Sequence, residues 1–394
     1  MNNNNLQSIA SGPTKKRVVV SASGKFHALR LASALNQIGY LEKIFIGYPK
    51  LSLRRPQIPA HKISSLSFKE PLYRILSRLP FLNKEDLAYY TSDLFDYFVS
   101  RRILPCDIFW GWSECSLRTM RKIRKSFEAI LVLERGSSHI GFQYEILKKE
   151  QEVLGVKVNL PSSLIIEKEL QEYDEADYIV VPSKYAKETF LKKGIDCGKV
   201  IDVLLGVDLD IFPWVLKRDD IFRIVSVGVS IRKGTHYLLE AVKRLKIKEM
   251  ELWLLGNFSQ DIIHFLKRHS DAFRYIGGVP QHRLSEYYCQ GSVFVLFSIE
   301  DGFGMSLLEA MACGLPVICS DAVGAKEVVR DGVDGFVVPS RDVNSLSEKL
   351  LYFYQNPKKA KEMGTAAFER VSKFFSWRNY NERIESVCGF LRKG

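Results

Sequence analysis

Strand-like runs alternate with helix-like runs along almost the whole chain, and this alternation limits the fold more than any other feature. The apolar run KRVVVSAS at 16–23 is followed by the amphipathic pattern FHALRLASALNQIG, which closes at Gly39. The same order returns at 222–247, where FRIVSVGVS precedes THYLLEAVKRLK. Strands that alternate with helices indicate parallel sheets. The sequence therefore predicts an α/β protein with two Rossmann-like domains.

The boundary between the two domains is expected where the periodicity lapses, in LLGVDLDIFPWVLKRDD at 204–220. The predicted organisation has four parts: a disordered tail at 1–14, an N-terminal Rossmann-like domain at 15–205, a C-terminal Rossmann-like domain at 206–375 and, at 376–394, a C-terminal helix that crosses back to the first domain.

Composition narrows the class of protein. The first residues lack an apolar core and resemble a disordered tail more than a signal peptide. No apolar run approaches the length of a membrane span. Seven cysteines are scattered without a CxxC pair, which argues against a zinc site and favours a reduced, cytoplasmic protein.

The net charge of +12 lies entirely in the first part of the chain. Residues 1–157 hold 25 Lys and Arg against 13 Asp and Glu, and the remainder holds 32 of each. Such a surplus suits nucleic acid, an anionic membrane face or an acidic substrate. Nucleic acid is the weakest of the three, because no nucleic-acid-binding motif accompanies the charge. Four cations share one predicted helix face, Arg118, Arg121, Lys122 and Lys125. This face is either an ordinary solvated surface or a contact with the inner face of the membrane.

The stretch SIEDGFGMSLLEAMACG at 298–314 follows the buried-strand pattern VFVLF. Ligands of open parallel sheets bind beyond the carboxyl ends of strands. Gly302 and Gly304 would let backbone N–H groups approach a ligand, and a helix that starts near Ser306 would favour phosphate. Ser306 and Glu309 also fit a capping box, in which Glu309 only satisfies a backbone N–H. That alternative stays open from the residues alone.

A second turn, SIRKGTH, places Arg232 and Lys233 where a strand meets a helix. Cations at a helix N-terminus are mildly unfavourable unless an anion lies between them. Together the two turns suit a nucleotide diphosphate.

With these motifs the chain resembles the retaining glycosyltransferases of family 4, the glycosyl transferases group 1. That family has the GT-B fold, in which two Rossmann-like domains face each other across a cleft. The resemblance covers roughly residues 175–390 and rests on the two turns together with ADYIVVPSKYAKETFLKKGI, GVDLDIF, YIGGVPQHRLSEYY, AVGAKEVVRDGVDGFVVP and FSWRNYNERI. Residues 16–160 match more weakly, through SASGKFHALRLASAL and LERGSSHIGFQ.

The resemblance implies an acid pair separated by seven residues. Asp301 takes the position of the acid that meets the donor sugar, and Glu309 takes that of the acid that meets the ribose. Asp301 is an aspartate where the family has glutamate, so its reach is shorter by about 1.5 Å. Val229 stands where the family usually has an arginine. The diphosphate-binding and nucleotide-binding set that follows is Arg232, Lys233, Val279, Gly302, Phe303, Gly304, Met305 and Glu309.

In the N-terminal domain the resemblance implies that Gly24 approaches the donor from across the cleft. The family often has a histidine after a strand equivalent to ILVLE. Arg135 occupies the nearest position, and His139, four residues on, is the candidate replacement. Asp301, Glu309, His139 and Arg135 are therefore the candidate catalytic residues.

The implied activity is transfer of a sugar from a nucleotide-activated donor to a glycan, a lipid-linked or another acceptor in cell-surface polysaccharide or glycolipid synthesis. No metal or cofactor is expected. Two alternatives remain: a GT-B phosphorylase, which would use phosphate and pyridoxal, and a nucleotide-sugar binder without activity.

Overall fold

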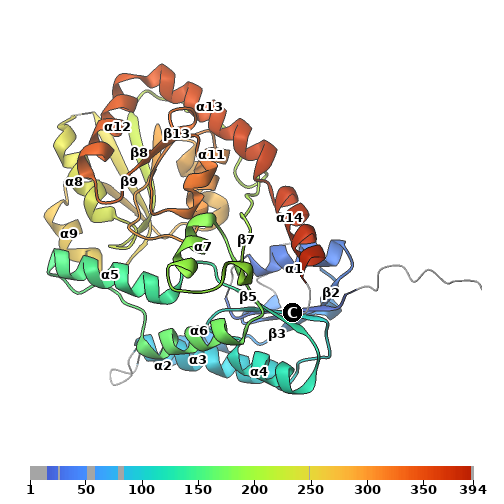
Figure 1. Cartoon of the computed structure of the whole chain (residues 1–394). Helices are drawn as coiled ribbons and strands as arrows, with labels where there is room; N and C mark the ends of the chain where they lie inside the picture. Colours follow the sequence, from blue (N-terminus) through green and yellow to red (C-terminus); the bar gives the residue numbers. More distant parts are fainter. Residues whose placement is uncertain (1–15, 25–26, 51–57, 79–83, 248, 392–394) are drawn as a thin grey trace, which may run out of the picture.

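The computed structural model describes residues 16–24, 27–50, 58–78, 84–247 and 249–391. Two lobes are visible in Figure 1, and each is built around a parallel sheet. The expected tail at 1–14 lies outside the described residues. This architecture of two Rossmann-like lobes confirms the predicted GT-B fold class.

The N-terminal sheet has seven strands in the order β3-β2-β1-β4-β5-β6-β7. Its strands are β1 Val18–Ala22, β2 Leu41–Ile46, β3 Ile63–Ser65, β4 Ile108–Trp112, β5 Ile130–Glu134, β6 Tyr178–Val181 and β7 Val200–Asp202. Its helices are α1 Ala28–Gln37, α2 Lys69–Leu76, α3 Lys84–Ser100, α4 Leu117–Ser126, α5 Ile140–Leu154, α6 Ser163–Glu175 and α7 Lys184–Leu191.

The C-terminal sheet has six strands in the order β10-β9-β8-β11-β12-β13. Its strands are β8 Phe222–Val229, β9 Met250–Phe258, β10 Arg274–Gly277, β11 Val293–Leu296, β12 Val317–Ser320 and β13 Gly335–Val338. Its helices are α8 Thr235–Leu245, α9 Ile263–Arg268, α10 Ser285–Tyr288, α11 Met305–Ala312, α12 Val343–Gln355, α13 Pro357–Phe374 and α14 Trp377–Phe390, with the 3-10 helix η6 Gly324–Val328.

The central strands are buried and mostly apolar because helices cover both faces of each sheet. Every residue of β1, β4, β5, β11 and β12 is buried, which is the pattern of strands inside a parallel sheet. The strand order reverses between β1 and β4 and again between β8 and β11. Crevices beyond the carboxyl ends of such strand pairs are the usual ligand sites of open α/β sheets.

Two helices connect the lobes. The last helix, α14, lies against α1, and the side-chain amide of Asn381 donates to Gln37 at 2.9 Å. The helix α5 leaves the N-terminal sheet and lies beside the C-terminal lobe in Figure 1. Leu147 of α5 and Val158 after it belong to the hydrophobic cluster of the C-terminal lobe. The domain boundaries themselves stay a prediction, but α5 packs with the second lobe.

The far end of α5 is fixed by a buried carboxylate. Glu150 is fully buried and accepts hydrogen bonds from His236 at 3.1 Å, Tyr237 at 2.6 Å and Arg341 at 2.7 Å. Burial would raise the pKa of Glu150, but these three partners lower it to about 2. The carboxylate is therefore ionised and paired, as a buried charge must be. Within the described part of the chain, no helix is both long and apolar enough to cross a bilayer.

Candidate active site

The loop after β11 contains two glycines, and the backbone explains both. Gly304 has a φ of 93° and is the N-cap of α11, a conformation that side chains with a Cβ rarely adopt. At Gly302, an added Cβ would lie 2.3 Å from the Cα atom of Ser137, which belongs to the N-terminal lobe. Gly302 is therefore required where the two lobes touch, a reason that differs from the ligand approach suggested by the sequence.

Glu309 lies on α11, and the capping-box interpretation of this residue is wrong. The N-cap of α11 is Gly304, so Ser306 lies inside the first turn and cannot take the capping position. Glu309 instead accepts hydrogen bonds from Nε2 of Gln281 at 2.8 Å and from the hydroxyl of Tyr288 at 3.1 Å. Only 4% of Glu309 is exposed, and this burial raises the pKa of its carboxyl group despite the two hydrogen bonds.

The two cations between β8 and α8 lie beside the two acids of the β11 loop. Nζ of Lys233 pairs with the carboxylate of Asp301, and Nε of Arg232 donates to Glu300 at 2.7 Å. Burial would raise the pKa of Asp301, but Lys233 and Arg232 outweigh it and hold that pKa below its ordinary value. Because β8 and β11 are neighbouring parallel strands, their carboxyl ends bring all four side chains to one edge.

Glu300 links this cluster to the N-terminal lobe. Its buried carboxylate accepts hydrogen bonds from Ser138 at 2.6 Å, from Gln143 at 3.1 Å and from Ser137 at 3.2 Å. Burial would raise the pKa of Glu300, but Arg232 and the hydrogen bonds lower it, so the carboxylate is ionised. No motif in the sequence predicted a role for Glu300. Its one signal was the pair of adjacent acids in SIEDG.

Arg135 follows β5 and is held by the same network. Only 6% of it is exposed, and it donates to Glu169 at 2.8 Å and to Gln143 at 3.1 Å. Burial would lower the pKa of the guanidinium, but Glu169 outweighs it and raises that pKa. Since Gln143 also donates to Glu300, these contacts favour a role in positioning rather than direct contact with substrate.

His139 begins α5 as its N-cap. Its Nδ1 atom accepts a hydrogen bond from the backbone N–H of Gly141 at 3.1 Å. The ring packs against two aromatic side chains, Tyr173 and Phe190, and only 4% of the residue is exposed. Burial first, and then the nearby charge of Arg135, lower the pKa of His139 to about 4. These contacts support a neutral capping histidine.

The remaining candidate residues are Phe303, Met305, Val279 and Gly24, and not all of them lie beside the cluster formed by Glu300 and Asp301. Phe303 is buried, and its backbone N–H donates to the carboxylate of Asp301, so that amide already has a partner. Met305 is half-buried at the first turn of α11. Val279 follows β10, two strands from β8, and Gly24 follows β1 in the other sheet. Among the described residues, no group of three or more His, Cys, Asp or Glu side chains gathers as a metal site.

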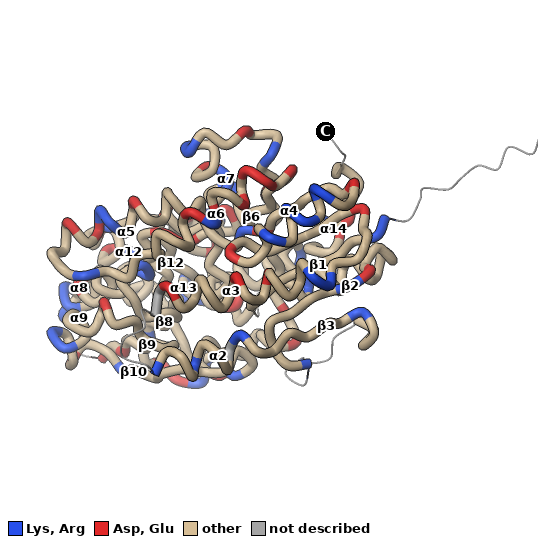
Figure 2. The backbone as a smooth tube through the Cα atoms, turned by 90° about the horizontal axis from the view of Figure 1, so that it is seen from below, with Lys and Arg blue, Asp and Glu red and all other residues tan. Residues whose placement is uncertain are grey.

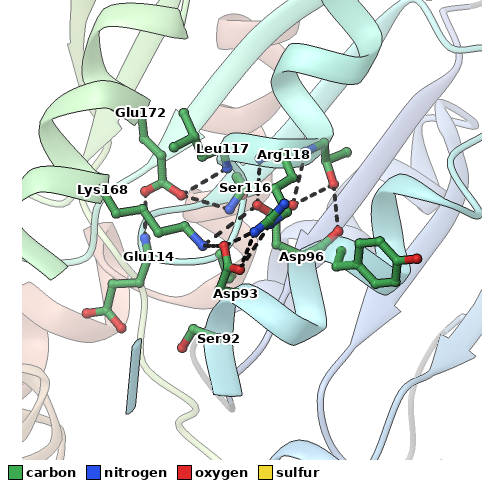
Figure 3. A network of polar contacts seen from close by, with 12 residues as sticks. Ser92, Asp93, Asp96, Glu114, Ser116, Leu117, Arg118, Lys168 and Glu172 are labelled. Carbon is green, nitrogen blue, oxygen red and sulfur yellow. Dashed lines mark hydrogen bonds and ion pairs between the residues drawn. The ribbon is translucent and has the colours of Figure 1, made fainter. Parts of the chain in front are cut away.

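A second buried network lies on the N-terminal side, at the carboxyl end of β4 (Figure 3). Glu172 is fully buried and accepts three backbone N–H groups at 2.6–3.1 Å, those of Glu114, Ser116 and Leu117. Lys168 donates to Asp93 at 3.0 Å. Burial raises the pKa of Glu172 to about 8, against the opposing charge of Lys168. This network fixes the loop from β4 to α4, where Glu114 has a φ of 72°.

Comparison with known proteins gives one family match, which covers the C-terminal lobe. The family described as Glycosyl transferases group 1 matches residues 210–370. O-antigen chain mannosyltransferase B from Escherichia coli is 40% identical over 106 residues, which are 27% of each chain. The chain spans about half or less of the length of the curated relatives that it matches.

Solved structures share the whole fold. The sucrose-phosphate synthase of Thermosynechococcus elongatus aligns with a TM-score of 0.71 at 19% identity, over 95% of this chain and 98% of that chain. HepE of Anabaena, solved in complex with UDP-glucose, aligns with a TM-score of 0.66 at 14% identity, over 95% of this chain and all of that chain. The C-terminal lobe therefore matches the glycosyl transferases group 1 family, and the two lobes together have the GT-B fold of these solved structures.

Proposed function

We propose that the protein is a retaining glycosyltransferase that transfers a sugar from a nucleotide-activated donor bound between the two lobes. The observation that carries this proposal is the cluster of Arg232, Lys233, Glu300 and Asp301 at the carboxyl ends of β8 and β11, directly against Ser137. The family match over this lobe and the fold shared with a protein solved with UDP-glucose support it.

The donor diphosphate is expected to bind Lys233 and Arg232. On binding, Lys233 exchanges the carboxylate of Asp301 for a phosphate oxygen, which leaves Asp301 free to accept hydrogen bonds from sugar hydroxyls. Arg232 stays oriented because Glu300 holds its Nε atom. The N-termini of α8 and α11 add partial positive charge beside the same anion. The carboxylate of Glu309 then accepts hydrogen bonds from the ribose hydroxyls.

The reaction that follows needs no general base from the protein. In front-face attack, an acceptor hydroxyl forms its bond to the anomeric carbon as the bond from that carbon to the diphosphate breaks. The leaving diphosphate takes the proton of the hydroxyl, and the new linkage retains the donor's configuration. The protein contributes by orienting the sugar and stabilising the charge that develops on the diphosphate.

The acceptor is proposed to carry negative charge or to lie at an anionic membrane surface, because the charge surplus falls in residues 1–157. The face of α4 contributes less unpaired positive charge than its sequence suggested. Arg118 pairs with Asp93 at 2.7 Å, Arg121 pairs with Glu175 at 2.8 Å, and acidic residues lie beside basic ones around α4 and α6 in Figure 2.

Lys122 and Lys125 remain as exposed cations on α4. We expect sedimentation with phosphatidylglycerol vesicles at low salt, weakened by the double change Lys122→Glu and Lys125→Glu and abolished at high salt. If the wild-type protein fails to sediment with anionic vesicles at low salt, the membrane part of the proposal is wrong and a soluble acidic acceptor is favoured.

The test of the activity is release of nucleoside diphosphate from a panel of nucleotide sugars, with and without glycan and lipid-linked acceptors. We expect turnover with at least one donor, a product with retained anomeric configuration by NMR, and loss of turnover in Lys233→Ala. Lys243→Ala, at the opposite end of α8, is the matched control and should keep turnover. Binding without turnover would favour the silent binder, and phosphate-dependent release of sugar 1-phosphate would favour the phosphorylase.

A further inference from the structure

A cavity of about 610 Å³ lies away from the proposed donor site and is lined by two cysteines, Cys289 and Cys313. Phe222, the first residue of β8, and Pro316, just before β12, also line it. The cavity is therefore at the amino ends of the strands, whereas the acid cluster lies at their carboxyl ends. Its wall includes Trp214, which is 38% exposed.

The two cysteines end neighbouring helices. Cys289 is the C-cap of α10 and Cys313 is the C-cap of α11. Their thiols are hydrogen-bonded to each other, and Sγ of Cys289 also lies 3.6 Å from the carbonyl oxygen of Pro213. All seven cysteines are free thiols; Cys289 is half-buried, and Cys313 is only 1% exposed.

This geometry makes the two sulfurs unequal. The hydrogen bond from Cys313, the largest effect, lowers the pKa of Cys289 to about 7. The same hydrogen bond, together with burial, raises the pKa of Cys313. An ordinary cysteine has a pKa of about 8.5, so Cys289 carries more thiolate at neutral pH than an ordinary thiol. The thiolate is the reactive form, and it faces a cavity large enough to admit a small reagent.

We propose that Cys289 and Cys313 form an oxidisable dithiol, with Cys289 as the residue that reacts with peroxides and Cys313 as the residue that resolves the product. The Cys289 thiolate attacks one oxygen of hydrogen peroxide, the O–O bond breaks, and Cys289 becomes a sulfenic acid. The Cys313 sulfur then attacks Cys289, an S–S bond forms, and water leaves with the thiol proton. In total, two thiols and one peroxide give one disulfide and two waters.

The proposal does not depend on glycosyltransferase activity, but a contact connects the two cysteines to the proposed nucleotide site. Tyr288 directly precedes Cys289, and its hydroxyl donates to Glu309, four residues before Cys313. A disulfide would therefore join the ends of the two helices that carry this contact. Oxidation is expected to weaken nucleoside diphosphate binding in the wild-type protein and to leave it unchanged in Cys289→Ser.

The test uses the full chain with the exposed Cys197 changed to Ser, which removes the main route to disulfides between molecules. After hydrogen peroxide, intact mass should fall by about 2 Da, and a cross-linked peptide pair should contain Cys289 and Cys313. Without oxidant, iodoacetamide should label Cys289 with a midpoint near pH 7. Adding Cys313→Ala should raise that midpoint toward the ordinary value of about 8.5, because alanine cannot donate the hydrogen bond.

Cys289→Ser is the control and should abolish both the loss of mass and the labelling. If Cys313→Ala does not fold, the mass and labelling profile of the protein with Cys313 intact still decide the question. The proposal is wrong if peroxide leaves the mass of the Cys197→Ser protein unchanged or oxidises Cys289 without linking it to Cys313, or if the labelling midpoint of Cys289 lies at or above pH 8.5.

Discussion

A substitution at Glu309 can distinguish a structural role of this residue from a functional one. Its oxygens accept from Gln281 and Tyr288, and glutamine at this position would keep an oxygen for one of these donors. We expect Glu309→Gln to change the free energy of unfolding by about 1 kcal/mol or less. The specificity constant should fall at least tenfold with a raised KM for the donor, because the charge that favours the ribose hydroxyls is lost.

Chemical denaturation and donor kinetics check this prediction together. Glu286→Gln, which changes an exposed acid on α10, is the matched control. If Glu309→Gln has the specificity constant of the wild type, Glu309 has a purely structural role.

Glu300 makes a different prediction, because it is buried and ionised between the lobes. Glu300→Gln removes the charge opposite Arg232, and hydrogen bonds to charged groups contribute about 1.5–3 kcal/mol. We expect a loss of unfolding free energy of that size. A double-mutant cycle with Ser138→Ala should give a coupling energy above about 0.5 kcal/mol, since the two side chains are 2.6 Å apart. Additive effects would show that the contact between the lobes does not form in solution.

At the scale of elements, His139 caps the start of α5 and Glu150 lies in its last turns, and the N-cap makes a prediction about pH. His139 has a pKa of about 4 in the folded protein, below its ordinary value of 6.5. Between pH 4 and pH 6.5 this histidine is therefore protonated in the unfolded chain but neutral in the folded protein. The stability that depends on the neutral ring is fully present above pH 6.5 and is lost as the pH drops toward 4. The expected loss is on the order of 2–3 kcal/mol.

His139→Asn tests this assignment, because asparagine is also a good N-cap but does not titrate. Because the variant also loses the ring contacts with Tyr173 and Phe190, each protein is compared with its own stability at pH 7.5 in thermal unfolding. The variant should lose less stability than the wild type between pH 6.5 and pH 4. It should also retain glycosyl transfer. Loss of turnover with unchanged stability would instead restore His139 as a catalytic residue.

The elements themselves were largely predictable, whereas the contacts between the two lobes were not. Buried runs such as VFVLF and amphipathic runs such as THYLLEAVKRLK carry their own periodicity, so β11 and α8 follow from local sequence. The parallel sheet also predicts that Lys233 and Asp301 meet at one edge. The start of α11 at Met305 lies one residue from the expected position, but Gly304 is its N-cap, so the capping box suggested by Ser306 and Glu309 does not form.

At the scale of the whole molecule, the relative placement of the lobes determines the contacts that the sequence could not predict. Glu300 meets Ser138, and Leu147 packs in the core of the other lobe, only because the lobes are oriented as they are. No local pattern specifies that orientation. The carboxylates, cations and glycines of the proposed donor site were visible in the sequence, but the partners that hold them were not.

The central claim is that a nucleoside diphosphate binds between the lobes through the turn between β8 and α8. Calorimetric titration of UDP, GDP and ADP against the wild type, Lys233→Ala and Lys243→Ala tests it most directly. We predict that at least one nucleotide binds the wild type and Lys243→Ala equally, and that Lys233→Ala, folded by circular dichroism, binds it at least tenfold more weakly, as expected for a lost charge-assisted hydrogen bond. Equal affinity of Lys233→Ala and the wild type, or no binding of any of the three nucleotides, would contradict the account.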